Sequence, residues 1–398
     1  MPNNAYSSVL SLPALNDAWR TIFRKASPRS RNSVGVDNVS LNDFRSDEKA
    51  HLNRLARDLR SKTFQFTSLR PHLIPKSNGK DRLICVPTVQ DRVVQRALLD
   101  FLSVRYAGKL ANKVSYGFVK ERGVKKAAKD ACDLRAKHQW VYKTDITSFF
   151  DKIDRERLQW ALKSAVRERS LHPILMQAIA SEIATVKGSQ ATRILRLGIE
   201  HGKGVRQGMP LSPFFSNIML SGFDQEIEQS GLRAVRYADD LIFFASSRNE
   251  CEWIAMFCSK ELGRLGLQVP PIEPDSKSVI YEPTEPAEFL GVSLTPYGGS
   301  YRVELTKAQI DVIRDELLKL GSIPELVSRK ITLPMLGHLL ALRRNGYLAA
   351  YDVCHNVSQL EHELVKLQQR VLRRLYADGL GIKLATLSGS ARTFLGLE

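Results

Sequence analysis

Apolar positions in the first third of the chain recur with the spacings of both helices and strands. Three leucines within residues 47–60 lie on one helical face, and residues 89–110 are also predicted to be helical. Between them, the sequence RPHLIPKSNGKDRLICVP predicts two strands around a turn at Ser77-Asn78-Gly79, because Asn-Gly supplies the positive φ that a hairpin requires. Residues 1–30 are weakly apolar and lead into the basic, Ser-rich sequence KASPRSRNS, which is typical of a linker.

The middle of the chain favours short strands next to acidic residues. Residues 140–146 (WVYKTDI) predict a strand, and a helix is expected from about Asp154. Residues 232–245 (LRAVRYADDLIFFA) predict two apolar strands around an acidic centre, and a further strand pair is expected near residues 279–294. Helices and strands are therefore mixed along this part of the chain.

The last hundred residues have a different pattern, in which apolar residues recur at helical spacing only. A small helical bundle explains this pattern better than a coiled-coil dimer, because the heptads are few. The residues that carry the periodicity belong to three expected helices: Ile310, Ile313, Leu317 and Leu320; Leu336, Leu339 and Leu340; and Val357, Leu360, Leu364, Leu367, Val371 and Leu375.

Positive charge is concentrated in one quarter of the chain. The 398 residues, enough for two or three domains, contain 59 Lys and Arg against 42 Asp and Glu, a net charge of +17. Residues 51–150 alone contain 21 basic and 8 acidic residues, a net charge of +13. Such a local excess favours a polyanionic partner, and nucleic acid is preferred to an acidic membrane because no basic helix has an aromatic face.

Several classes of protein are disfavoured by what the sequence contains. Its five cysteines are scattered and form no C-x-x-C pair, which argues against a disulfide framework or a zinc knuckle. Apolar runs are too short to cross a membrane, and the N-terminal residues do not resemble a secretory signal. We therefore expect a cytoplasmic protein that is not bound to a membrane.

Candidate chemistry begins with the sequence Tyr237-Ala238-Asp239-Asp240 between two apolar strands. Two adjacent carboxylates at a tight turn repel each other and cost desolvation, and a divalent cation removes both penalties by binding them. Asp145 at the end of an earlier strand would complete the carboxylate set that two-metal phosphoryl transfer requires. In isolation, the acidic pair could be a solvated turn and Asp145 a helix N-cap.

A third element is the sequence Gln207-Gly208-Met209-Pro210-Leu211-Ser212-Pro213, which is followed by a helix-like segment. Glycine and proline here allow the backbone to approach a ligand closely before a helix begins. A purely structural loop would explain glycine and proline equally well, but would not require Gln207 or the Ser212-Pro213 pair.

These motifs together resemble the reverse transcriptases. DITSFFDKI, QGMPLSP, YADD and Phe289-Leu290-Gly291 after Lys277 occur in the order of the reverse transcriptase palm motifs. IPKSNGKDRLICVPTVQDRVVQ and SYGF resemble the fingers motifs of bacterial enzymes of the group II intron lineage, and GVDNVSLNDF resembles their N-terminal extension. The resemblance covers about residues 30–295.

The resemblance implies an α+β fold of the right-hand polymerase type. Residues 1–70 would be an N-terminal extension, and residues 71–300 would form fingers and a palm with a ferredoxin-like sheet. Residues 301–398 would form an all-α thumb or C-terminal domain.

The resemblance also implies a role for individual residues, with two Mg²⁺ ions, or Mn²⁺, as cofactors. Phe150 could instead be a core residue, and the three cations among the substrate contacts could be solvated surface charges. The implied catalytic residues are Asp145, Asp239 and Asp240, with Ile146 as a further metal ligand; the substrate contacts are Lys76, Arg82, Phe150, Gln207, Gly208 and Lys277; and the primer grip is Phe289, Leu290 and Gly291.

The subfamily is expected to be that of the defence-associated bacterial reverse transcriptases. The Asn-Ala-x-x-His and Val-Thr-Gly elements of retron enzymes are not found in the sequence, nor is a His/Cys nuclease pattern. The expected partners are dNTPs, nascent cDNA and an RNA template that is a dedicated non-coding RNA. A homo-oligomer is compatible with the sequence, and a group II intron-type enzyme or a retron-like enzyme remains an alternative.

A basic cluster after SYGF is a candidate RNA contact. In a helix through this region, Arg122, Lys126 and Lys129 would share one face, so together they could follow a phosphate backbone. The alternative is a solvated helix face.

Overall fold

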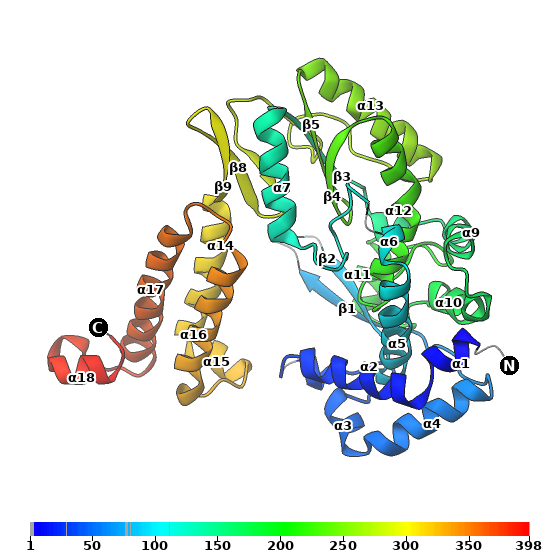
Figure 1. Ribbon diagram of the computed structural model, residues 1–398. Coiled ribbons are helices and arrows are strands. Elements are labelled where there is room, and N and C mark those ends of the chain that lie inside the picture. Colours follow the sequence, from blue (N-terminus) through cyan, green and yellow to red (C-terminus); the bar gives the residue numbers. More distant parts are fainter. Residues whose placement is uncertain (1–3, 29, 76–78, 80, 111, 398) are drawn as a thin grey trace. The chain divides into compact units, whose positions relative to one another are not determined.

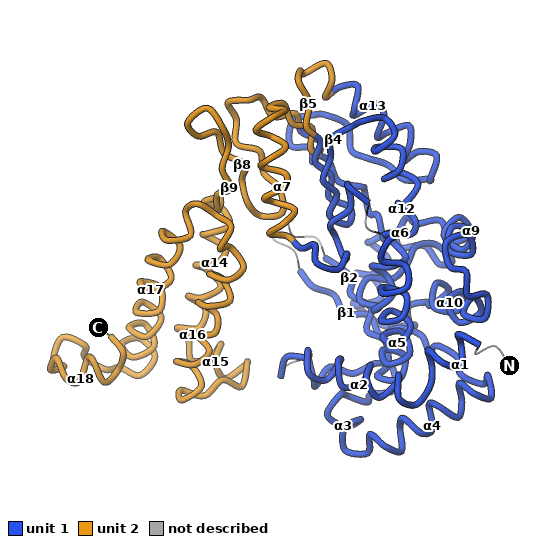
Figure 2. Tube along the Cα trace, viewed as in Figure 1, with its two compact units in different colours: residues 1–123, 144–243, 252–279 blue, residues 124–143, 244–251, 280–398 orange. Residues whose placement is uncertain are grey.

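A computed structural model describes residues 4–28, 30–75, 79, 81–110 and 112–397 (Figure 1). The chain forms two compact units (Figure 2): residues 1–123, 144–243 and 252–279 form unit 1, and residues 124–143, 244–251 and 280–398 form unit 2. The expected boundaries at residues 70 and 300 do not coincide with the edges of these units. Each unit is assembled from segments that are far apart in the sequence.

Unit 1 begins with helices that the sequence only partly indicated. Helix α2 (Leu12–Lys25) lies in the region described above as weakly apolar, for which no helix was predicted, and it buries Leu15 and Trp19. Ser11 caps its first turn, since its hydroxyl accepts a hydrogen bond from the Ala14 amide. The other helices at this end are α1 (Ala5–Val9), α3 (Leu41–Ser46), α4 (Glu48–Arg60), α5 (Val89–Arg105) and α6 (Ala107–Leu110). Helix α2 packs on α5, so the N-terminal residues belong to the core of this unit.

The expected hairpin is present as a separate two-stranded sheet. Strands β1 (Arg70–Pro75) and β2 (Asp81–Val86) pair antiparallel, with Pro75 opposite Asp81. Gly79 has the positive φ expected for the turn, at +76°, whereas Ser77 and Asn78 lie outside the described residues.

A four-stranded sheet carries the acidic motifs. Its strands are β3 (Trp140–Asp145), β4 (Arg233–Tyr237), β5 (Asp240–Ala245) and β6 (Val279–Tyr281), in the order β4-β5-β3-β6. Helix α12 (Ser212–Gln229) precedes β4, and helix α13 (Arg248–Arg264) precedes β6. The β-α-β-β-α-β succession with this strand order is the ferredoxin-like arrangement, and it confirms the expected α+β class.

Shorter helices fill the connection between β3 and β4. They are α8 (Phe149–Lys152), α9 (Arg155–Ala165), α10 (His172–Ile179) and α11 (Ser189–Leu195). Helix α9 begins one residue after Asp154, as expected, because the Asp154 side chain accepts a hydrogen bond from the Arg157 amide. Helix α9 packs against α12.

Unit 2 contains a second sheet, in which a buried arginine joins a helix to the strands. The sheet consists of β7 (Ala287–Phe289), β8 (Val292–Tyr297) and β9 (Ser300–Leu305), all antiparallel. Arg135 in helix α7 (Val124–Lys137) is fully buried and donates hydrogen bonds to the carbonyl oxygens of Leu294 at 2.6 Å, Glu285 at 2.6 Å and Glu282 at 2.9 Å. Its guanidinium also lies 4.4 Å from the centre of the Tyr301 ring.

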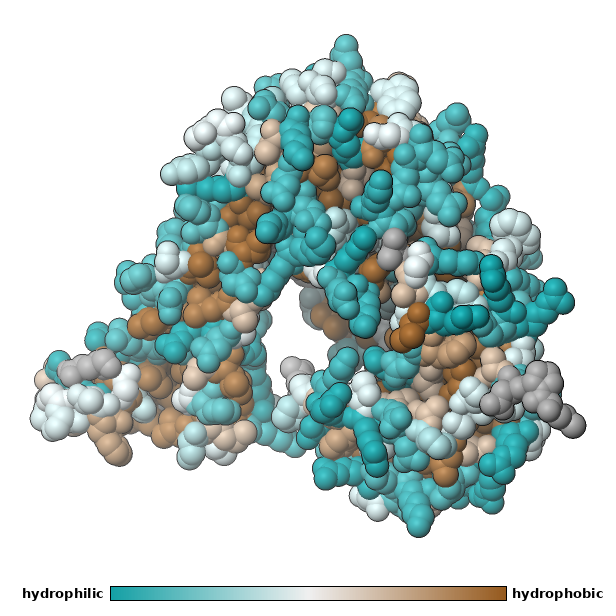
Figure 3. All heavy atoms as spheres, in the orientation of Figure 1, coloured by the Kyte–Doolittle hydropathy of each residue, from teal (hydrophilic) through white to brown (hydrophobic). Residues whose placement is uncertain are grey.

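The C-terminal region is helical, as its periodicity predicts. Its helices are α14 (Lys307–Leu318), α15 (Ile323–Ser328), α16 (Leu333–Ala350), α17 (Val357–Arg374) and α18 (Gly389–Phe394). In α17 the buried residues are Leu360, Leu364, Leu367 and Val371, which are four of the residues that carry the periodicity. No helix among the described residues is long and apolar enough to cross a membrane. Hydrophilic residues cover most of the face shown in Figure 3.

Candidate active site

Two carboxylate-bearing segments meet at one edge of the four-stranded sheet. Asp145 is the last residue of β3, and Ala238-Asp239 is the tight connection between β4 and β5. The amide of Ile146 donates a hydrogen bond of 3.0 Å to the carbonyl oxygen of Asp239, so the two segments are joined directly. Ala238 has a φ of +58°, a conformation that a residue with a side chain rarely adopts. The turn is therefore held in a strained form that presents Asp239 beside Asp145.

Charges of both signs act on this pair of carboxylates. Burial raises the pKa of Asp239, and the negative charge of Asp145 raises it further. The positive charges of Lys277 and Arg82 act in the opposite direction and lower the pKa of Asp239. Lys277 also donates a hydrogen bond from its ammonium group to Asp145 Oδ2. Four of the residues singled out in the sequence are thus close enough to influence one another.

The donor atoms at this edge suit a hard divalent cation. Asp145 Oδ1 is buried and has no hydrogen-bond partner among the described residues, which leaves an oxygen ligand available. The Ile146 side chain is buried, so this residue could bind a metal only through its backbone. Within the described parts of the chain, no three His, Cys, Asp or Glu side chains are gathered so that they could hold a metal ion together. In this structure the positive charge that contacts Asp145 is the ammonium group of Lys277.

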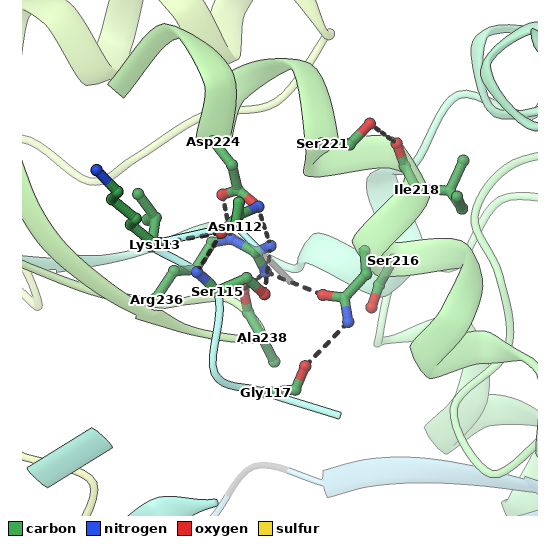
Figure 4. A network of polar contacts seen from close by, with 12 residues as sticks. Asn112, Lys113, Ser115, Gly117, Ser216, Ile218, Ser221, Asp224, Arg236 and Ala238 are labelled. Atoms are coloured by element: carbon green, nitrogen blue, oxygen red, sulfur yellow. Dashed lines mark hydrogen bonds and ion pairs between the residues drawn. The ribbon is translucent and has the colours of Figure 1, made fainter. Parts of the chain in front are cut away.

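A buried polar network behind the turn was not foreseen from the sequence (Figure 4). Arg236 in β4 is 0 % exposed and forms a bidentate ion pair with Asp224 of α12, at 2.5 and 2.6 Å. The same guanidinium donates to the carbonyl oxygen of Ala238 at 3.1 Å and to the Ser115 hydroxyl at 2.9 Å. Asn217 donates to the carbonyl oxygen of Gly117 at 2.9 Å. These contacts hold the β4–β5 turn between α12 and the segment around SYGF.

The loop that contains Gln207 and Gly208 lies against strand β2. The carbonyl oxygen of Gln207 accepts a hydrogen bond of 2.7 Å from the Cys85 amide, and the Gln207 side chain is half-buried. Gly208 has a φ of +107°, and a Cβ atom there would lie 2.4 Å from the carbonyl oxygen of Cys85. Only glycine fits this close approach. Cys85 lies three residues after Arg82 on β2, so the loop and the candidate triphosphate contact share one strand.

Phe150 is not the core phenylalanine of helix α8, because its neighbour Phe149 takes that place. Phe149 is buried, whereas Phe150 is partly exposed, with the two ring centres 5.3 Å apart. The carbonyl oxygen of Phe150 accepts a hydrogen bond of 2.8 Å from Val205. Phe150 is thus placed at the base of the segment that leads to Gln207.

The expected primer grip forms the β7–β8 hairpin of unit 2. Phe289 is fully buried, so its ring belongs to the core and is not available to a primer. Leu290 and Gly291 are the two turn residues, with φ values of +53° and +79°, as in a type I′ turn. Any contact with a primer would therefore come from the turn and its backbone.

The prediction that Arg122, Lys126 and Lys129 share one helical face is wrong for Arg122. Helix α7 begins at Val124, so Arg122 precedes it and is not on a shared helical face. Arg122 instead donates to the carbonyl oxygens of Asn112 and Ser115 and stacks on Tyr116. Lys126 and Lys129 are exposed in the helix, and Lys126 pairs with Asp130 at 3.0 Å. Lys76 lies outside the described residues.

Comparison with known proteins agrees with the arrangement of these motifs. Residues 74–294 match the model of the family described as reverse transcriptase (RNA-dependent DNA polymerase). Protein YkfC of Escherichia coli is 30 % identical over 210 residues, which are 51 % of this chain and 52 % of that protein. The retron Ec83 reverse transcriptase of E. coli is 27 % identical over 48 % of this chain and 57 % of its own length.

A group II intron-encoded protein is also similar. LtrA of Lactococcus lactis is 27 % identical over 225 residues, which are 54 % of this chain and 34 % of that protein. The chain thus spans about half, or less, of the length of these relatives. Since the family model covers more than half of the chain, this protein belongs to the reverse transcriptase (RNA-dependent DNA polymerase) family.

Proposed function

We propose that this protein is an RNA-directed DNA polymerase whose active site is the sheet edge that carries Asp145, Asp239 and Asp240. The observation that carries the proposal is the hydrogen bond between Ile146 and Asp239, which brings the end of β3 to the β4–β5 turn. Arg82 and Lys277 both lower the pKa of Asp239 by their positive charge, as cations that bind a triphosphate would.

Asp145, Asp239 and Asp240 would hold divalent cations between them, without all three binding one ion, and Mg²⁺ is the expected ion with Mn²⁺ as an alternative. A divalent cation held there would supply the charge that activates a 3′-hydroxyl and neutralises the leaving pyrophosphate. Asp145 Oδ1, buried and without a partner among the described residues, supports this assignment. A divalent cation suits this position better than an ammonium group, because it takes six or more oxygen ligands whereas an ammonium group donates at most three hydrogen bonds.

The remaining roles belong to side chains and backbone around the carboxylates. Arg82 would neutralise the triphosphate, and Gly208 would let the backbone approach the incoming nucleotide. Phe150 would close the space at the sugar 2′-position, and so exclude ribonucleotides. Lys277 would lie near the pyrophosphate and give it a proton.

We further propose that the template is a dedicated structured non-coding RNA and that the cDNA acts in defence against phage. This assignment rests on the resemblance of the motifs to defence-associated enzymes. A group II intron-type enzyme and a retron-like enzyme are the alternatives. Similarity to LtrA supports the first, and similarity to the retron Ec83 reverse transcriptase supports the second. Sequencing the RNA and DNA that co-purify with the protein decides among them: a single RNA encoded beside the gene, without intron splice junctions or branched RNA–DNA, is the expected result.

The catalytic assignment is tested by primer extension on an RNA template with Mg²⁺ and dNTPs. Asp239→Asn keeps the size of the side chain and removes a charged metal ligand, so we expect incorporation to be abolished while the thermal midpoint is retained. Asp275→Asn, a change at an exposed aspartate of the same unit, is the matched control. Normal incorporation by the Asp239→Asn variant would refute the proposed active site.

A further inference from the structure

One anchor of the β1–β2 hairpin comes from a segment that no motif includes. Residues 182–193, here called the 182–193 segment, contact the hairpin from its base to the end next to its turn. At the base, Leu69 exchanges backbone hydrogen bonds of 2.8 Å with Glu182 and Ala184. Further along, Gln190 Nε2 donates to the carbonyl oxygen of Pro71 at 3.1 Å. Arg193 of α11 then reaches Asp81, the first residue of β2.

The contact between Arg193 and Asp81 is bidentate. Arg193 Nη2 lies 2.6 Å from Asp81 Oδ1, and Arg193 Nε lies 2.8 Å from Asp81 Oδ2. The two side chains are 46 % and 16 % exposed, and the hydrogen bond from Arg193 lowers the pKa of Asp81. A planar guanidinium fixes a carboxylate in position and direction, which a lysine would not do.

This ion pair is better suited to positioning than to global stability. Exposed pairs contribute little to folding, whereas an isolated two-stranded hairpin is only marginally stable in water and needs contacts from outside. Here the hairpin is a separate sheet, and Arg193 holds the end farthest from its base. Side chains on a strand alternate between faces, so Asp81 can face α11 while the next residue, Arg82, acts on Asp239.

The other end of the 182–193 segment reaches the loop that carries Gln207. Glu182 accepts hydrogen bonds of 2.7 Å from Arg155 and from Arg206, the residue before Gln207. The segment therefore contacts both candidate nucleotide-binding elements, the hairpin at one end and the loop at the other.

We propose that Arg193 is a positioning residue for nucleotide binding, which acts by holding Asp81 and thereby the β1–β2 hairpin that presents Arg82. This inference rests on the proposed function, since it assigns Arg82 to the triphosphate. Arg193 itself contacts no substrate in this proposal, and its effect passes through Asp81.

The test is a double-mutant cycle read in primer extension. We expect Arg193→Ala to raise the KM for dNTP about two- to fivefold, with kcat nearly unchanged, which is the range of one exposed ion pair. In an Asp81→Ala background the same change should leave KM unaltered, because the partner is already missing. Arg196→Ala, which removes a charge from the adjacent turn without an ion pair described for it, should leave KM unchanged.

Hydrogen exchange of the free protein keeps this inference separate from the proposed activity. Arg193→Ala should speed exchange of backbone amides in residues 70–75 and 81–86 without nucleotide present, and Arg196→Ala should not. If the parent protein fails to incorporate dNTPs, the proposed function fails, and the exchange result still decides the anchoring. Equal effects of Arg193→Ala in both Asp81 backgrounds, or unchanged exchange, would overturn the inference.

Discussion

At the scale of single residues, the site depends on backbone placement as much as on side-chain chemistry. Asp239 follows an alanine held at positive φ, and its carbonyl oxygen is bound by Ile146. Gly208 occupies a position in which any side chain would collide with Cys85. Asp239 is therefore presented by a strained turn and Gly208 by a close approach of two backbone segments, which are common arrangements where a fold must place groups precisely.

Phe150 provides a prediction at this scale. Phe150→Ala should admit ribonucleotides while extension with dNTPs continues, because the space next to the sugar would open without loss of a core residue. The measurement is the ratio of kcat/KM for dNTP and NTP in single-nucleotide extension. Phe149→Ala is the contrast, since it removes a buried ring and should lower stability by about 3–5 kcal/mol instead. An unchanged ratio in the Phe150→Ala variant would remove this residue from sugar selection.

Residue-level prediction succeeds where the chemistry is local in the sequence. Asp239 and Asp240 stand together at a turn, and Asp145 ends a clear strand, so their proximity could be anticipated. The pairing of Arg193 with Asp81 could not, because nothing in either local sequence indicates a partner 112 residues away. The prediction for Arg122 failed because the helix begins two residues after it, at Val124. The chain before the helix forms a turn in which Glu121 has a positive φ.

At the scale of elements, periodicity predicted most strands and several of the longer helices, but not α2 or α13 and not the contacts between elements. Helix α17 follows its apolar repeat closely, whereas α2 was missed although Leu15, Trp19 and Ile22 recur at helical spacing within it. The expected strand pair near residues 279–294 is in fact part of four strands, β6 to β9. Short strands in different sheets have similar patterns, so the sequence alone does not say which strands pair.

The polar network behind the β4–β5 turn gives an element-level prediction. Asp224→Asn should lower the free energy of unfolding by about 3–5 kcal/mol, because it leaves the buried Arg236 guanidinium without a counter-charge. Glu226→Gln, an exposed change in the same helix, should cost less than about 0.5 kcal/mol. Urea unfolding of both variants is the measurement. Equal stability of the two variants would show that the ion pair is not the main tie between α12 and β4.

Helix α7 gives a second prediction, which follows from the corrected position of Arg122. Lys126→Gln/Lys129→Gln should weaken binding of unrelated single-stranded RNAs alike, and reduce the slope of log K against log salt by up to about 0.7 per contact. Thermal stability should barely change, since exposed charges contribute little to it.

Arg122→Gln is the control, and we expect it to change stability where the double lysine variant does not. It should lower stability, because two backbone carbonyl groups lose their donor. If the double lysine variant has the same RNA affinity and the same salt slope as the parent, the RNA does not bind to these two lysines.

At the scale of the whole molecule, the candidate nucleotide site is confined to one of the two units. Asp145, Asp239, Lys277 and Arg82 all belong to unit 1, whereas the β7–β8 turn belongs to unit 2. The expected division into consecutive domains assumes that each is one stretch of chain. Contacts group the residues differently, because α7, which packs on β8 and β9, falls in the same unit as the C-terminal helices.

Calorimetry tests this division. Mg²⁺ and a dNTP should raise the unfolding temperature of one transition and leave a second transition in place, because a ligand stabilises only the unit that binds it. Asp239→Asn should abolish the shift. A single transition that moves as a whole with ligand would mean that the two units unfold together.

Arg135 also bears on how the protein is made. Its helix, α7, leaves the ribosome long before its hydrogen-bond acceptors at Glu282, Glu285 and Leu294, the last of them 159 residues later. At a translation rate of about 5–20 residues per second, these carbonyl groups are synthesised on the order of 10–30 s after Arg135. During synthesis α7 therefore lacks the strands that later cover Arg135, and it is accessible to chaperones and to non-native contacts. The yield of active enzyme should depend on the translation speed of residues 138–294 more than on that of the N-terminal helices.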